Sequence, residues 1–190
     1  NTLVRLTQGT LDIADRIRTN DFTSLSKTEQ ATRAFDAGPG LGIDHIWFNL
    51  NSADPKGKPL ANDVKRSWFS DERFRQAVAA AVDRDSIANV TLQGLATPLY
   101  GFVSPANKVW LDPSLAKINY SLADAEKLLA EAGFKKGGTA EAPVLTDAQG
   151  RPVEFTLIVP AENEARKLMA AVIQQDLAKL GIKMQVAPIE

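Results

Sequence analysis

The sequence predicts an α/β (α+β) fold, a mixed sheet flanked by helices with a C-terminal βαβ unit, and three observations support this class. The chain closes with a strand-like run over 153–159, an amphipathic helix over 164–180 and a second strand over 182–186. Because one helix joins these strands, we expect a parallel pair with a right-handed crossover over 153–190. Capped amphipathic helices precede this unit. Of the 190 residues, 44% are hydrophobic and 24% are charged, as in ordinary globular domains.

The first part of the chain predicts short elements. Residues 2–7 are typical of the end of a helix that Gly9 stops, and residues 11–13 alternate like a short strand. A second helix is expected over 20–35, capped at its first or second residue. The GPGLG run over 38–42 indicates a loop. Its spacing is not GxGxxG and no strand precedes it, so it does not indicate a dinucleotide site.

Residues 43–51, IDHIWFNLN, alternate between two kinds of side chain and therefore predict a strand. One face is aliphatic and aromatic. The other carries an imidazole, an indole and two amides, which can stack against and hydrogen-bond an extended ligand. The alternative is that Trp47 packs beneath a helix. The candidate ligand-binding residues are His45, Trp47, Asn49 and Asn51.

A polar loop follows over 52–67, where Pro55, Gly57 and Pro59 exclude a regular element. Ser70 is then expected to cap a helix whose first turn is acidic, as the helix dipole favours. Apolar side chains recur along this helix with the spacing of one buried face. They are Phe74, Ala77, Val78, Ala81 and Val82.

A shorter helix is expected to begin at Asp83 and to stop at Gly94. The charged cluster Asp83, Arg84 and Asp85 lies at this helix junction, so we expect capping and ion pairing from it before any catalysis. The side chains of this helix that are expected to face the core are Ile87, Val90 and Leu92.

The next helix is marked by the capping box of Ser121 and Asp124 and stops at Gly133. A loop rich in proline and aromatic residues precedes it over 97–114, and residues 135–152 are rich in turns. The apolar side chains expected on its buried face are Ala125, Leu128, Leu129 and Ala132.

Composition excludes several classes of function. The chain has no cysteine, which rules out disulfides, thiolate metal sites and thiol nucleophiles, and its one histidine is His45. With 22 basic and 23 acidic residues the net charge is −1, so we expect no nucleic-acid partner. Among catalytic motifs, HExxH, GxSxG and the P-loop are missing from the sequence. We therefore expect no enzyme activity, no metal site and no cofactor.

Four motifs carry more information than periodicity. The run SDERFRQAVAAAVDRDSIANVTLQGLATP over 70–98 resembles the helix-pair signature of the peptide- and nickel-type solute-binding proteins of bacterial ABC importers. YSLADAEKLLAEAGF over 120–134, IQQDLAKLGIKMQV over 173–186 and LTQGTLDIA over 6–14 are similar to further motifs of that family. Thr10 stands where a glutamate is usual, and Phe74 replaces the usual valine. The order of the four motifs also matches.

The resemblance implies two α/β lobes joined by a hinge, with a ligand enclosed between them. Residues 1–190 would be a single domain, the second large lobe, with 1–20 close to the hinge. We expect it to be an excised or processed piece of a longer parent protein. The main ligand anchors would lie mostly in the parts of the parent outside this sequence. The helix-pair residues are expected to be structural: Asp71, Arg73, Arg75, Asp83 and Arg84.

The same resemblance implies that the parent captures a peptide or a similar small polar solute and delivers it to a membrane permease by lobe closure. The partners would be that ligand, the permease and the first lobe of the same parent. The location would be periplasmic or otherwise extracytoplasmic, with or without a lipid anchor. A signalling or chaperone-like binding module with the same fold is the alternative, because fold does not settle function.

Overall fold

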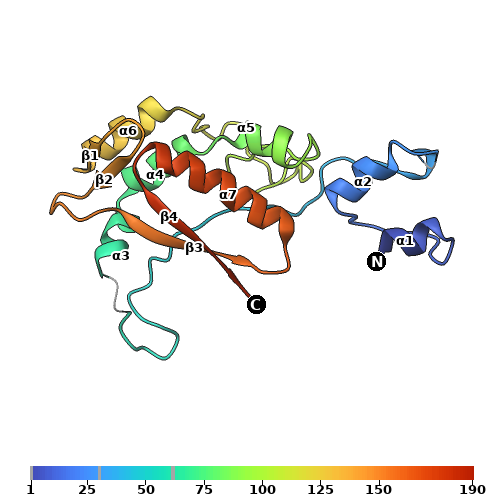
Figure 1. Cartoon of the computed structure of the whole chain (residues 1–190), viewed down its shortest axis with the longest axis horizontal. Coiled ribbons are helices and arrows are strands. Elements are labelled where there is room, and N and C mark those ends of the chain that lie inside the picture. The colour runs from blue at the N-terminus through green and yellow to red at the C-terminus, as the bar shows by residue number, and fades with distance from the viewer. Residues whose placement is uncertain (1, 30, 61–62) are drawn as a thin grey trace.

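The structure is a computed structural model that describes residues 2–29, 31–60 and 63–190. It confirms the predicted class, with helices packed against short strands (Figure 1). Helices α1 and α2 lie to one side of the body that the later elements form. The elements are α1 Thr2–Thr7, α2 Thr19–Leu25, the 3₁₀ turn η1 Ala31–Arg33, α3 Asp63–Ser70, α4 Glu72–Ala81, α5 Arg84–Ser86, the π-helical turn η2 Ile87–Thr91, α6 Leu122–Glu131, β1 Lys135–Gly138, β2 Pro143–Thr146, β3 Glu154–Pro160, α7 Glu164–Lys179 and β4 Lys183–Ile189.

The core forms where α4 packs on α6 and where α7 covers the strands β3 and β4. Phe74 of α4 is completely buried, and its ring centroid lies 5.3 Å from that of Phe134. The stripe predicted for α4 is confirmed, since all five of its side chains are buried. Full burial of such side chains contributes about 1.5–3 kcal/mol for each large one. Other buried core residues are Leu129, Leu145, Val153, Leu177, Leu180 and Ile182.

The C-terminal βαβ unit is confirmed, because β3 and β4 pair in parallel with α7 between them in the chain. Phe155 lies opposite Met184 in this pair, and both side chains face the core. β1 and β2 form an antiparallel hairpin, so among the described residues the parallel and antiparallel pairings occur in two separate two-stranded sheets and not in the one mixed sheet that the sequence predicts. Two backbone hydrogen bonds of 2.9 Å join the sheets. Leu145 N–H donates to the Gly181 carbonyl, and Val153 N–H donates to the Leu145 carbonyl.

Side-chain caps begin α4, α5, α6 and α7. Asp83 and Ser121 each accept a hydrogen bond from the backbone N–H three residues later, at 2.9 and 3.1 Å, as predicted. The cap predicted at Ser70 is wrong, since Ser70 is the last residue of α3. Asp71 caps α4 instead, accepting from the Arg73 N–H at 2.9 Å. A carboxylate in this position also interacts favourably with the helix dipole.

Residues 43–51 form no strand, which corrects the sequence prediction. No described segment pairs with them in a ladder, and a strand needs such a partner for its backbone groups. The strand predicted at 11–13 is wrong for the same reason. The helix predicted over 20–35 is shorter than expected, since α2 ends at Leu25 and the 3₁₀ turn η1 follows over Ala31–Arg33. Residue 30 of that prediction lies outside the described residues.

Three further predictions of local structure need correction. The loop predicted over 52–67 already contains the start of α3. The turn-rich residues 135–152 hold the β1–β2 hairpin, whose first strand, KKGG, is exposed throughout. Val90, expected inside, is 73% exposed. It lies in the π-helical turn η2, where the wider spacing of hydrogen bonds moves side chains out of an ordinary helical stripe.

Candidate ligand-binding site

The segment 43–51 is held against the core by Phe48. The Phe48 ring centroid lies 4.8 Å from that of Phe69, 6.0 Å from that of Phe74 and 6.3 Å from that of Phe155 on β3. Aromatic rings at such separations attract one another beyond the effect of burial alone. Phe48 therefore anchors the segment although no ladder hydrogen bond does so.

A second contact holds the beginning of the same segment. The Nε of Arg166, in the first turn of α7, donates to Oδ1 of Asp44 at 2.8 Å. Both side chains remain about half exposed, so the pair contributes at most about 1 kcal/mol. The pair mainly fixes the position of the segment, because Asp44 is held by Arg166 on α7 whereas Phe48 packs near Phe155 on β3.

The four candidate ligand-binding residues are all exposed. Trp47 is 75% exposed, which contradicts the alternative that it packs beneath a helix. The ring centroids of His45 and Trp47 lie 4.8 Å apart, so the structure brings these two together. The Asn51 N–H donates to Oδ1 of Asn49 at 3.0 Å, and no described residue accepts from the Asn49 NH₂ group. These side chains are therefore available to a ligand.

Phe102 joins this group from a distant part of the chain, and the sequence analysis did not single it out. Its ring lies edge-on to His45 with a centroid distance of 5.5 Å, and the side chain is 78% exposed. The Ser104 hydroxyl donates to the Gly40 carbonyl at 2.5 Å and so holds the two loops together. The only signal in the sequence was that this loop is rich in aromatic residues and proline.

The helix-pair residues make contacts within the lobe. Arg73 donates to both carboxylate oxygens of Asp71 and, at 2.7 Å, to the Glu131 carbonyl at the end of α6. The Arg73 hydrogen bond is the main reason why the pKa of Asp71 lies below its ordinary value. Arg75 donates to the Phe69 carbonyl at 2.7 Å. These bonds connect α4 with α3 and α6.

Arg84 extends this pattern at the junction after α4. Its guanidinium donates to the Ala79 carbonyl at 2.9 Å and lies 5.6 Å from the centroid of the Tyr100 ring. Burial lowers the pKa of Arg84 from its ordinary value. The Arg84 guanidinium therefore hydrogen-bonds a carbonyl near the end of α4 and packs against the Tyr100 ring. Both contacts lie within the lobe, so the role of Arg84 is structural.

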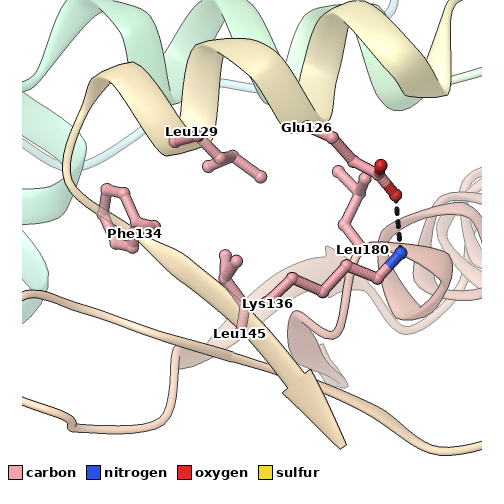
Figure 2. Close-up of a pocket in the computed structure, with 7 residues that line it drawn as sticks. Glu126, Leu129, Phe134, Lys136, Leu145 and Leu180 are labelled. Carbon is pink, nitrogen blue, oxygen red and sulfur yellow. Dashed lines mark hydrogen bonds and ion pairs between the residues drawn. The ribbon is translucent and has the colours of Figure 1, made fainter. Parts of the chain in front are cut away.

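A small cavity lies between α6 and the β1–β2 hairpin (Figure 2). Its volume is about 80 Å³, well below the roughly 300–1,000 Å³ of sites that enclose small-molecule ligands. Lys136 Nζ donates to Oε1 of Glu126 at 2.6 Å beside it (Figure 2). The cavity is lined by Glu126, Leu129, Ala130, Phe134, Lys136, Leu145 and Leu180. The cavity is therefore too small to enclose a small-molecule ligand.

Two kinds of feature are absent from the described residues. No three His, Cys, Asp or Glu side chains among them lie close enough to hold a metal ion. Across residues 2–29, 31–60 and 63–190, no helix has both the length and the apolar character needed to cross a bilayer.

The fold is that of part of a two-lobed periplasmic binding protein. The oligopeptide-binding protein AppA of Bacillus subtilis, solved in complex with a nonapeptide, superposes with a TM-score of 0.69 at 24% identity, covering 100% of this chain and 34% of that one. MelB of Agrobacterium fabrum, solved with stachyose, gives 0.74 at 22% identity, covering 99% and 29%. At these identities the likeness shows the fold alone.

The chain belongs to the bacterial extracellular solute-binding proteins, family 5, whose middle region matches residues 1–190. A probable ABC transporter-binding protein of Deinococcus radiodurans is 40% identical over 188 residues, which cover 93% of this chain and 30% of that protein. AppA is 33% identical over 129 residues, covering 66% and 23%. The chain therefore spans less than a third of the length of these curated relatives. Members of the family are binding proteins, not enzymes.

Proposed function

We propose that this chain is the second large lobe of a solute-binding component of an ABC importer, with residues 1–20 close to the hinge. The observation that carries the proposal is the match of the family's middle region along residues 1–190. The parent captures a peptide or a similar small polar solute outside the cytoplasmic membrane. It passes the solute to the importer's permease. It performs no catalysis, and a lipid anchor is compatible with this role.

The exposed strip formed by His45, Trp47, Asn49 and Asn51 supports the ligand-facing part of the proposal. In the parent, the first lobe closes over the ligand from the opposite side. Closure follows from differential affinity, because a ligand that contacts both lobes binds the closed state more tightly than the open one. The names of the relatives favour this role over the signalling or chaperone-like alternative.

The test uses the whole parent receptor. The purified protein is incubated with two mixtures, a casein digest and a pool of plant oligosaccharides, then desalted, and bound compounds are identified by native mass spectrometry. We expect capture of one or a few compounds at a ratio of one per receptor and a raised melting temperature in their presence. Failure to retain any compound, together with an unchanged melting temperature, would contradict solute capture. A heat-unfolded sample is the control for non-specific carry-over.

A further inference from the structure

We propose that His45, Trp47 and Phe102 form one ring platform, which stacks against an uncharged ring of the ligand; this inference rests on the proposed function. The centroid distances from His45 are 4.8 Å to Trp47 and 5.5 Å to Phe102. The Trp47 and Phe102 side chains are 75% and 78% exposed. Large apolar side chains gathered on an exposed surface indicate an interaction site, whereas scattered ones do not.

The platform is fixed from both sides before any ligand arrives. Phe48 packs among core rings and Asp44 is paired with Arg166, so the segment carrying His45 and Trp47 has an anchor close to each end. The Ser104 hydroxyl, bonded to the Gly40 carbonyl, places the loop that carries Phe102 beside the loop before that segment. Preorganised groups bind more tightly because less freedom is lost on binding.

Charge decides the class of ligand group. Trp47 and Phe102 carry no charge, and the neighbouring Asp44 is already neutralised by Arg166 at 2.8 Å. A charged ligand group would therefore meet no free opposite charge. An anion would only lose water, and a cation would gain the attraction of the ring faces but no unpaired carboxylate. The His45 ring is tilted by 52° to Trp47 and by 85° to Phe102, so a ligand ring can stack on one ring and meet another edge-on. The NH₂ group of Asn49 can donate to a polar atom at the edge of the ligand ring. Such a ring comes from a sugar or from an aromatic side chain of a peptide.

Saturation-transfer NMR on the whole parent receptor tests the platform with four probes. Methyl β-glucoside and N-acetylphenylalanine amide supply the two neutral rings, while N-acetyllysine amide and N-acetylglutamate amide supply charge without a ring. We expect saturation transfer to at least one ring probe. The probe that gives the signal shows whether the ring comes from a sugar or from an aromatic side chain of a peptide. Trp47→Ala and Phe102→Ala should each reduce it at least about threefold. Trp47→Tyr, which keeps a ring, should retain most of it.

Trp110→Ala is the matched control, since Trp110 is also 75% exposed but makes no ring contact with any described residue. It should leave the signal unchanged. Equal transfer to the charged probes, no transfer to either ring, or full signal in Trp47→Ala would overturn the platform. If the receptor captures a compound but neither ring probe gives a signal, the platform is rejected and the proposed function is not. A ring signal from a receptor that captures nothing rejects the proposed function alone.

Discussion

The carboxylate of Asp176 on α7 accepts a hydrogen bond from the backbone N–H of Asp83, which lies 93 residues earlier in the chain, at a distance of 3.1 Å. Asp176 is only 4% exposed and also accepts from Lys179 Nζ at 2.7 Å. The bond satisfies a backbone donor at the junction of α4 and α5. It therefore joins the βαβ unit to the helix pair.

Replacing Asp176 should destabilise the protein. Asp176→Ala leaves the Asp83 N–H without its acceptor, and we expect a loss of about 1–3 kcal/mol in the free energy of unfolding. Asp176→Asn keeps an acceptor oxygen and should lose less. Urea unfolding followed by circular dichroism measures both values. Equal stability of Asp176→Ala and the unmodified protein would show that this contact is unimportant.

Two glycines allow the cost of a left-handed backbone conformation to be measured separately from the cost of a steric clash. Gly133 and Gly181 both have φ near the left-handed region, at +88° and +80°. A Cβ on Gly181 would lie 2.5 Å from the Leu145 backbone nitrogen, whereas nothing lies within 4 Å of one on Gly133. Gly133→Ala should cost about 1 kcal/mol from the backbone conformation alone. Gly181→Ala should cost clearly more, because α7 and β2 must separate. Equal melting temperatures would contradict the close approach.

Acid should weaken the protein through Asp147, a buried carboxylate that accepts hydrogen bonds from Trp68 Nε1 at 3.0 Å and from Arg151. Desolvation alone would raise its pKa, but the hydrogen bonds from Arg151 and Trp68 together lower the pKa of Asp147 below its ordinary value of 3.8. A lowered pKa in the folded state stabilises the protein above the unfolded-state value. That contribution is lost as the pH falls below 3.8.

Urea midpoints measured from pH 7 to pH 3 test this dependence. Asp147→Asn should be less stable at pH 7 by about 1–3 kcal/mol, since its NH₂ group would face the donors of Trp68 and Arg151. The variant should also lose less stability on acidification than the unmodified protein does. The remaining slope comes partly from Asp71, whose pKa is also lowered. Parallel acid limbs in the two proteins would argue against the role of Asp147.

Local signals explain why the helices of the body could be predicted. The caps at Asp83 and Ser121 depend on residues three positions apart, and the stripe of α4 depends on one helical period. The βαβ unit could be predicted equally well, because strand, helix and strand follow one another directly in the sequence. In each case the relevant interaction partners are close in the sequence.

The misassigned elements depend on partners that the sequence does not identify. Residues 43–51 alternate like a strand, but a strand also needs a neighbouring backbone, and none of the described segments supplies it. β1 reads KKGG, which has no alternation, and pairs only because β2 folds back on it. The same limit applied to the candidate site. Phe102 approaches His45 through a contact between two loops, and no periodicity marks such a contact.

The helix-pair residues should affect stability more than ligand affinity. Asp83→Ala removes the acceptor for the Ser86 N–H and should cost about 0.5–2 kcal/mol. Arg75→Ala removes the bond to the Phe69 carbonyl and should lower the melting temperature as well. In the parent receptor, ligand affinity should change by no more than about threefold, or 0.7 kcal/mol. Scanning calorimetry and titration calorimetry separate the two quantities. Weakened binding at unchanged stability would indicate that these side chains contact the ligand.

The isolated lobe should bind its parent's ligand weakly. Enclosed sites cover about 70–90% of a ligand's surface, and one open lobe supplies only part of that contact. If the parent binds at about 1 μM, a lobe that retains half the binding free energy would bind near 1 mM. Titration of residues 1–190 with the captured compound measures this value. Micromolar binding by the isolated chain would place most of the recognition within it.

The central claim is that the exposed strip around Trp47 contacts the ligand. Titration calorimetry of the parent receptor with its captured compound should show that Trp47→Ala raises the Kd about tenfold or more, a loss of about 1.4 kcal/mol. Trp110→Ala, at the same 75% exposure, should change the Kd by less than about threefold. Unchanged affinity in Trp47→Ala, with the variant as stable as the parent, would contradict the claim.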